Sequence, residues 1–379
     1  MQQVKTSVLR AALAFALGAG VFQSAAAAES SRVDPLKPLM LTSDGRLAYI
    51  ITTRHWAVYP GKDLKTECPK GTNDGPREQF EKQFPTNGAK RTLVDTQLMR
   101  EGRQWFPSTE REPFEFKEVA GKVSYGMDLD GQVKPTDFVG PDGEKGIDNQ
   151  LFRAIGCISS YRPPGGHWRT SETQTLRRYN YNRFVIEITG VDSLENDAQV
   201  TVKSYRSLDP LMTDASGESF TPGAPQEIDE RWGAFAQSTW TGKIVNGVLI
   251  TDPADLVMPT AMSFGTTANH ELRGVRFKLT LTPESAKGFM AGYAGVDDFI
   301  RHLNVSSATA IQSYGQLSSP SLYRAMHRLA DGYPDPKTGE MTAISSALEV
   351  EFTRVFLTRG SATTGENPQL SQVKSGTKK

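Results

Sequence analysis

The fold is decided by RFVIEIT at residues 183–189 and QVTVKSY at residues 199–205, two runs in which β-branched and aromatic side chains are frequent. The polar sequence DSLEND, residues 192–197, lies between them. In the second run Val200 and Val202 alternate with polar residues, which is the period of a strand with one apolar face and one solvated face. The stretch therefore predicts an antiparallel hairpin with a loop of several residues.

Further strands are expected on both sides of this hairpin. The runs that share its β-rich composition are residues 45–60, 242–251, 272–281 and 349–357. Short strands separated by turn-rich segments, without β-α-β alternation, favour a mostly β protein. We therefore predict an antiparallel β-sandwich, and we do not expect a nucleotide-binding fold.

Helix signals are few. Asp297 and Asp298 precede the apolar run 299–303 and suit a helix N-terminus. Ser319 followed by proline predicts another helix start, so we expect a small helical portion near residues 283–332. A short helix is also expected within residues 90–105.

The first 28 residues have the pattern of a secretory signal peptide. A basic start is followed by the apolar run 11–22 and by four alanines that end at Ala28. The alternative is a membrane anchor, but the apolar run is shorter than the roughly 20 residues that a span needs. We predict cleavage near Ala28 and a soluble periplasmic or secreted protein without a membrane span.

This interpretation divides the chain into three parts. Residues 1–28 are the signal peptide, 29–357 form a β-rich globular region of one large or two smaller domains, and 358–379 form a disordered tail with few apolar residues. The whole chain has 43 basic and 43 acidic residues, and the leader contains two of the basic ones. Such a balance gives no electrostatic reason to bind nucleic acid.

The chain has two cysteines, Cys68 and Cys157. Two thiols in an oxidising compartment usually pair, so a disulfide is expected. The alternative is a pair of buried free thiols. A zinc site is not expected, because neither cysteine belongs to a C-x-x-C pair.

An acidic segment, DLDGQVKPTDFVGPDGEKGIDN at residues 128–149, carries the clearest candidate site. Its short oxygen-bearing side chains stand among four glycines, and Ca²⁺ prefers several such oxygens in flexible geometry. The candidate ligands are Asp128, Asp130, Asp137, Asp142, Asp148 and Asn149. The alternative is a pair of Asp-Gly turns with solvated side chains. The EF-hand spacing is absent.

A second candidate is the loop YRPPGGHWR, residues 161–169. It places aromatic, cationic and imidazole groups on a flexible backbone, as ligand-binding loops often do. The residues that would contact a ligand are Tyr161, Arg162, His167 and Trp168. The alternative is an ordinary surface loop.

The acidic segment also suggests a relationship. MDLDG…PDG…GIDN, together with Gly156-Cys157 and the earlier ECPKG at residues 67–71, resembles a family of uncharacterised exported bacterial proteins with a DxDG…PDG…GIDN acidic loop. The resemblance implies a β-sandwich and export, and it implies no established activity.

Two functions are therefore open. The first is an exported soluble β-sandwich protein that Ca²⁺ stabilises and that binds a ligand or a protein partner. The alternative is a carbohydrate-binding or glycoside-cleaving protein on the same fold, because tryptophan faces can stack on sugars. Glycoside cleavage would require two carboxylates about 5–10 Å apart in an open groove.

Overall fold

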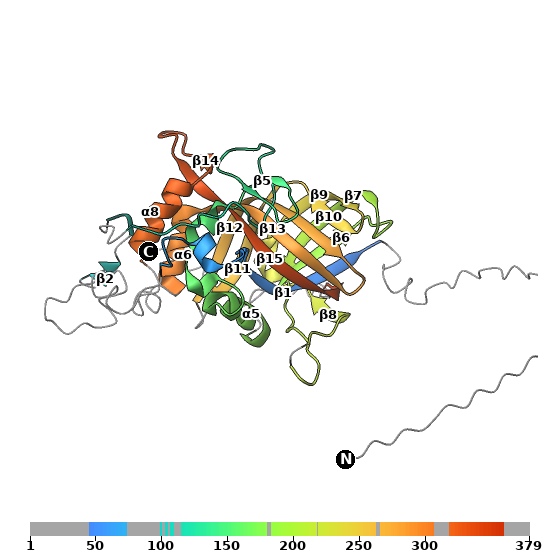
Figure 1. The fold of residues 1–379 in the computed structure, drawn as a ribbon. Helices are drawn as coiled ribbons and strands as arrows, with labels where there is room; N and C mark the ends of the chain where they lie inside the picture. Colours follow the sequence, from blue (N-terminus) through green and yellow to red (C-terminus); the bar gives the residue numbers. More distant parts are fainter. Residues whose placement is uncertain are drawn as a thin grey trace, which may run out of the picture.

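The computed structural model describes residues 45–73, 99–100, 103–104, 107–109, 115–179, 183–217, 219–262, 266–306 and 318–359 (Figure 1). The predicted signal peptide and residues 360–379 of the predicted tail lie outside these ranges. The protein is mostly β, with 42% strand and 20% helix, as the sequence predicted.

The main sheet is a closed barrel, so the predicted sandwich is wrong. Eight strands follow one another around it, and each pairs antiparallel with the next. They are β1 (Leu47–Trp56), β6 (Phe184–Thr189), β7 (Asp197–Arg206), β9 (Thr239–Val245), β10 (Val248–Thr251), β12 (Thr266–Leu281), β13 (Ser285–Gly295) and β15 (Met341–Thr358). The sheet closes because β15 pairs with β13 on one side and with β1 on the other.

The predicted hairpin at the centre of the sequence is confirmed as β6 and β7, with Val185 opposite Tyr205. The predicted strand over residues 242–251 is instead the end of one hairpin strand and the start of the next, β9 and β10. Asn246 and Gly247 connect them with positive φ angles of 50° and 79°. Two residues with positive φ match the right-handed twist of the strands they join.

Three further strands extend the main sheet. β11 (Ala254–Met262) pairs with β12, β14 (Gly332–Pro334) pairs with β15, and β8 (Ala224–Glu227) pairs with the end of β15 in parallel. Two separate hairpins are β2 (Met99–Arg100) with β3 (Arg103–Gln104), and β4 (Phe138–Val139) with β5 (Lys145–Ile147). The helix expected within residues 90–105 is not present in the part described, since β2 and β3 fall there.

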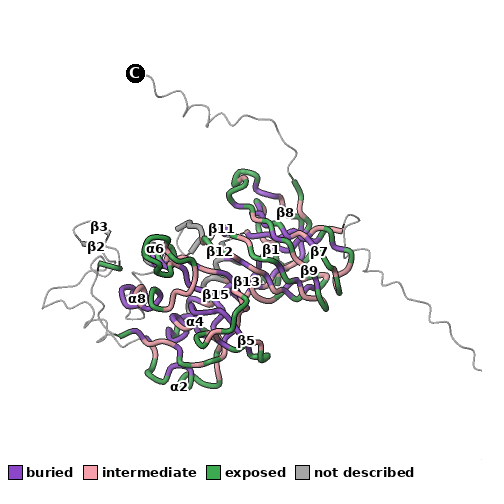
Figure 2. The backbone as a smooth tube through the Cα atoms, turned by 90° about the horizontal axis from the view of Figure 1, so that it is seen from above, coloured by how far each residue is buried: buried purple, intermediate pink, exposed green. Residues whose placement is uncertain are grey.

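Large apolar side chains fill the interior of the barrel. Trp240 lies with its ring centroid 5.1 Å from that of Phe277, and its Nε1 donates a hydrogen bond to the carbonyl of Val275 at 2.9 Å. An eight-stranded barrel has an interior just wide enough for such side chains. The same hydrophobic cluster includes Leu151, Ile300 and Leu322 of the helices. Figure 2 shows buried stretches in strands and helices alike.

The helices cover one end and one flank of the barrel (Figure 1). They are α2 (Leu64–Glu67), α4 (Gln150–Ile155), α5 (His167–Tyr179), α6 (Val296–Ser306) and α8 (Ser319–Leu329), with 3-10 turns η2 (Pro107–Thr109), η3 (Ser159–Tyr161) and η4 (Glu230–Ala236). Among the described residues, no helix has the length and apolar character needed to cross a membrane.

The predicted helical portion near residues 283–332 is correct for α6 and α8 only. Strand β13 occupies its first part, and α4 and α5 lie outside it. The sequence of α5 is polar, and its buried apolar contacts come chiefly from Trp168 and Leu176. Its apolar spacing is therefore too sparse to predict an amphipathic helix.

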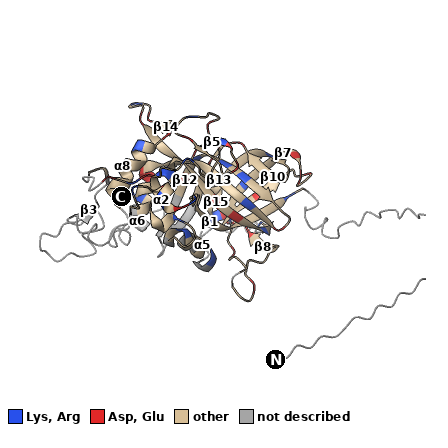
Figure 3. Cartoon of the chain, viewed as in Figure 1, with Lys and Arg blue, Asp and Glu red and all other residues tan. Residues whose placement is uncertain are grey.

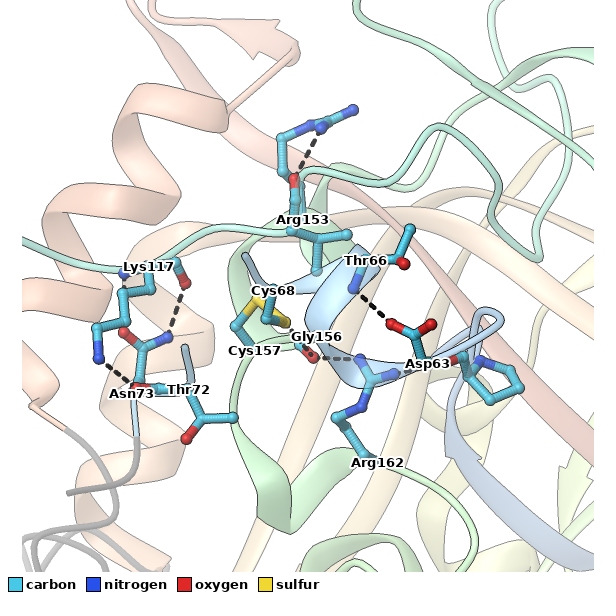
Figure 4. Close-up of a disulfide and its surroundings, with 12 residues drawn as sticks. Asp63, Thr66, Cys68, Thr72, Asn73, Lys117, Arg153, Gly156, Cys157 and Arg162 are labelled. Atoms are coloured by element: carbon cyan, nitrogen blue, oxygen red, sulfur yellow. Dashed lines mark hydrogen bonds between the residues drawn. A yellow bond between two sulfur atoms is a disulfide. The ribbon is translucent and has the colours of Figure 1, made fainter. Parts of the chain in front are cut away.

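The predicted disulfide is confirmed. The Cα atoms of Cys68 and Cys157 are 5.8 Å apart, and both residues are buried. The bond joins the end of α2 to the residue that follows Gly156 at the end of α4 (Figure 4). It closes a loop over a sequence separation of 89 residues, which contains the whole acidic segment.

Candidate metal centre

The two ends of the acidic segment are held together by backbone hydrogen bonds. Asp148 N–H donates to the carbonyl of Met127 at 2.9 Å. Leu129 N–H donates to Asp148 Oδ2 at 2.7 Å. Asp148 therefore lies directly beside the Asp128–Asp130 pair, although it comes 18 positions after Asp130 in the sequence.

Three carboxylates meet at this point. One oxygen each from Asp128, Asp130 and Asp148 lies within 4.8 Å of the other two. Backbone groups orient two of them: Asp128 Oδ1 accepts from Gly131 N–H at 2.6 Å, and Asp130 Oδ1 accepts from Gln132 N–H at 2.9 Å. The acidic cluster of Asp128, Asp130 and Asp148 could therefore hold a metal ion.

A glycine closes the cluster on one side. Gly146 has a φ of 78°, and a Cβ built there would lie 2.8 Å from the carbonyl oxygen of Gln132 and 3.4 Å from Asp128 Oδ2. The backbone of Gly146 therefore lies against two oxygens of the 128–132 turn. A side chain at this position would push them apart and would also strain the backbone.

The cluster carries unfavourable negative charge. Asp148 is 1% exposed. Burial raises its pKa to about 7, the hydrogen bond from Leu129 opposes this, and repulsion from Asp130 and other carboxylates adds to it. Lys134 forms an ion pair with Asp130, and that hydrogen bond raises the pKa of the lysine. One ammonium group thus compensates part of the charge of three carboxylates.

Asp331, which the sequence analysis did not single out, lies close to this group. Its carboxylate accepts from Ser345 N–H at 2.7 Å and from Ser345 Oγ–H at 2.6 Å. Burial raises the pKa of Asp331, while Lys134 lowers it. Burial and the nearby Asp148 and Asp331 carboxylates also raise the pKa of Tyr293. Asp331 therefore adds a fourth, half-buried carboxylate beside the cluster.

The other three predicted ligands have structural roles. Asp137 accepts from Lys134 N–H at 2.5 Å, and Asp142 accepts from Glu144 N–H at 3.1 Å, so both stabilise turns. Asn149 is the N-cap of α4, where its oxygen accepts from Phe152 N–H at 3.3 Å. Its amide nitrogen donates to the carbonyl of Tyr125 at 2.9 Å. The structure thus brings together three of the six predicted oxygen ligands.

The predicted ligand loop is largely packed into the protein. Tyr161 and Trp168 are buried in the main hydrophobic cluster. Arg162 is buried, and its guanidinium donates to the carbonyls of Gly156 and Pro60, each at 2.6 Å (Figure 4). His167 is the first residue of α5, and its side chain is not described. Tyr161, Arg162 and Trp168 therefore support the fold instead of forming an exposed loop.

Two of the tryptophans, Trp56 and Trp168, do not form an open sugar site. Trp56 and Trp168 face a pocket of about 20 Å³, which His270 and His302 also line. This volume suits a single water molecule. No carboxylate belongs to the described lining of that pocket. The carbohydrate alternative stays a prediction from the sequence.

Comparison with family models, with curated proteins and with solved structures finds no match to this chain. Inference about its function therefore depends on the geometry of the protein itself.

Proposed function

We propose that this chain is an exported calcium-binding protein in which Ca²⁺ occupies the acidic cluster and joins the two ends of the acidic segment. The observation that carries the proposal is the convergence of Asp128, Asp130 and Asp148. The disulfide supports export, because such bonds persist in oxidising compartments.

The chemistry of the cluster suits Ca²⁺. One oxygen from each of three carboxylates lies within 4.8 Å of the other two, close enough for one cation to contact all three, and Ca²⁺ takes carboxylate oxygens as ligands. The carbonyl oxygen of Gln132 is our candidate for a fourth ligand, because it and Asp128 Oδ2 both lie near Gly146. Ca²⁺ accepts such an irregular set, whereas Mg²⁺ demands near-ideal octahedral geometry.

Lys134 would leave its ion pair with Asp130 when calcium binds. In its ion pair with Asp130 the ammonium supplies one positive charge, and its side chain is 39% exposed. It can therefore turn toward solvent and leave Asp130 to a divalent ion. Replacing the single positive charge of the Lys134 ammonium by the double charge of Ca²⁺ relieves more of the repulsion among the carboxylates.

The ion would stabilise a contact between the segment and the outer face of the barrel. Lys278 of β12 pairs with Glu144 at 2.6 Å, and Arg276 Nη1 donates to the carbonyl of Asp128 at 3.4 Å. The acidic segment thus already lies on β12. Binding only to the folded protein stabilises it, by about 2.7 kcal/mol at a free concentration 100 times Kd.

The test is thermal unfolding and calorimetric titration of the purified mature protein with CaCl₂ and with a chelator. The melting temperature should rise with Ca²⁺ and fall with chelator, and the titration should give one site per chain. Asp130→Asn should lose most of this response, because it removes a ligand charge and frees Lys134.

The matched control is Asp142→Asn, which removes one charge from the same segment while keeping an oxygen for the Glu144 turn. It should respond to Ca²⁺ as the wild type does. Absence of saturable Ca²⁺ binding in the wild type would overturn the proposal. An equal loss in both variants would show general charge attraction in place of a site.

A further inference from the structure

Helix α5 presents a polar face away from the core. Arg169, Thr170, Thr173, Gln174 and Arg177 are spaced by one, three, one and three residues, so they share one side of the helix. The opposite side contributes buried Trp168 and Leu176. Helix α5 packs on β1, on the flank of the barrel (Figure 1), and its arginines are visible in Figure 3.

This face forms one wall of a pocket of about 440 Å³. Its lining residues are His55, Pro164, Arg169, Thr170, Thr173, Gln174, Arg177 and Gly217. Pockets that bind small molecules have volumes of about 300–1,000 Å³. The described lining has several hydrogen-bond donors and no carboxylate, so its chemistry is that of an anion site.

The base of the pocket is built and rigid. His55 of β1 and Glu349 of β15 are direct cross-strand partners, and His55 Nε2 lies 2.9 Å from Glu349 Oε2. Arg169 Nη2 lies 3.0 Å from the same oxygen. Burial would raise the pKa of Glu349, but hydrogen bonds from His55 and Arg169 outweigh it and hold the pKa below its usual value. One carboxylate therefore fixes two lining side chains.

Among the described lining residues, Arg177 adds a positive charge that no described carboxylate compensates. Glu349 compensates Arg169, whereas Arg177 forms no ion pair with any residue that the structure describes. Its guanidinium lies over the Phe220 ring, 5.2 Å from the centroid. That contact orients the planar group and leaves its N–H donors for a ligand. A guanidinium held in this way suits the paired oxygens of a carboxylate, phosphate or sulfate.

We propose that the α5 pocket binds a small polar molecule through an oxyanion group, with Arg177 as the main charge partner and Thr173 and Gln174 as hydrogen-bonding residues. The pocket lies on a different element from the acidic cluster and takes ligands of opposite charge. The proposal is therefore independent of calcium binding.

The test is calorimetric titration of the full mature protein, at constant ionic strength, with four probes. Glucose 6-phosphate and galacturonate carry the oxyanion on a polar molecule, and glucose and galactose are their uncharged counterparts. Saturable binding of either charged probe, without binding of its uncharged counterpart, is expected. The probe that binds more tightly identifies phosphate or carboxylate as the preferred group.

Two variants locate the site. Arg177→Gln changes an exposed residue and should weaken the charged probe by about tenfold or more, since a charge-assisted hydrogen bond contributes at least that factor. The control Arg301→Gln removes an arginine from α6, where its side chain is 65% exposed, and should leave binding unchanged. Failure of both charged probes to bind would overturn the proposal, as would an equal loss in the two variants.

Discussion

Removing the Cys68–Cys157 bond should cost a large part of the stability of this protein. The perturbation is the double variant Cys68→Ala/Cys157→Ala. Both side chains are buried beside α2 and α4, and alanine fits the space that each sulfur leaves. The variant therefore removes the covalent link with little new polarity in the core.

The magnitude follows from the length of the closed loop. For a sequence separation of 89 residues, the chain-entropy relation gives about 4–5 kcal/mol at 25 °C. Native proteins are stable by about 5–15 kcal/mol in total, so the loss is substantial. Backbone contacts at the bond remain in the variant: Asn73 N–H donates to the Cys157 carbonyl at 2.7 Å, and Gly71 N–H donates to the Cys68 carbonyl at 2.8 Å.

The assay is equilibrium unfolding in guanidinium chloride, followed by tryptophan fluorescence. The midpoint should fall in the double variant, and wild type treated with reductant should show a similar fall. The two single-cysteine variants should match the double variant within about 1 kcal/mol, since each lacks the cross-link. A double variant within about 1 kcal/mol of the oxidised wild type would refute this reasoning, because the loop constraint would then contribute little.

Gly146→Ala should lower stability by about 1–3 kcal/mol and weaken Ca²⁺ binding, because it adds backbone strain and a Cβ 2.8 Å from the Gln132 carbonyl. The control is Gly143→Ala, since Gly143 has a similar φ of 90° but open space where a Cβ would lie. Comparing the thermal unfolding of the two variants separates the effect of the steric contact from that of backbone strain. An equal loss of stability in both would refute the role of the contact. His302 stacks on His270 at 4.4 Å, and burial lowers the pKa of His302 to about 4. The fold favours the neutral form of His302, so the stability of the wild type should fall as the pH drops from about 6.5 to 4. The denaturation midpoint of His302→Phe should fall less over that range. Parallel midpoint curves for the two proteins would contradict this prediction.

The strands could be predicted from the sequence because residue type and alternation within each short segment indicate them. Alternation in β7 indicates one more buried and one more solvated face, whereas β6 is buried along nearly its whole length, and the structure confirms that the two strands pair. The closure of the sheet could not be predicted, since sandwiches and barrels share this alternation. Closure depends on β1 meeting β15, and no local pattern encodes that meeting.

The candidate site shows the same division. Asp128 and Asp130 stand two residues apart, and the density of carboxylates around them predicted their part in a cluster. Asp331 could not be found in this way, because the barrel brings it from about 180 residues away along the chain. The N-cap role of Asn149 had a local signal, an Asn before the apolar run of α4, but that helix has only six residues.

The meeting of β1 and β15 also determines when the protein can fold. Thr52 Oγ–H donates to the Glu351 carbonyl across 299 positions, so the barrel seam joins nearly the first and the last described residues. Such non-local pairing slows folding. A chain still being translated or translocated has no β15, and the edges of β1 and β13 stay unpaired until it emerges. If the chain is exported as proposed, this topology keeps the barrel open during transit, and those unpaired edges are prone to aggregation until the last strand arrives.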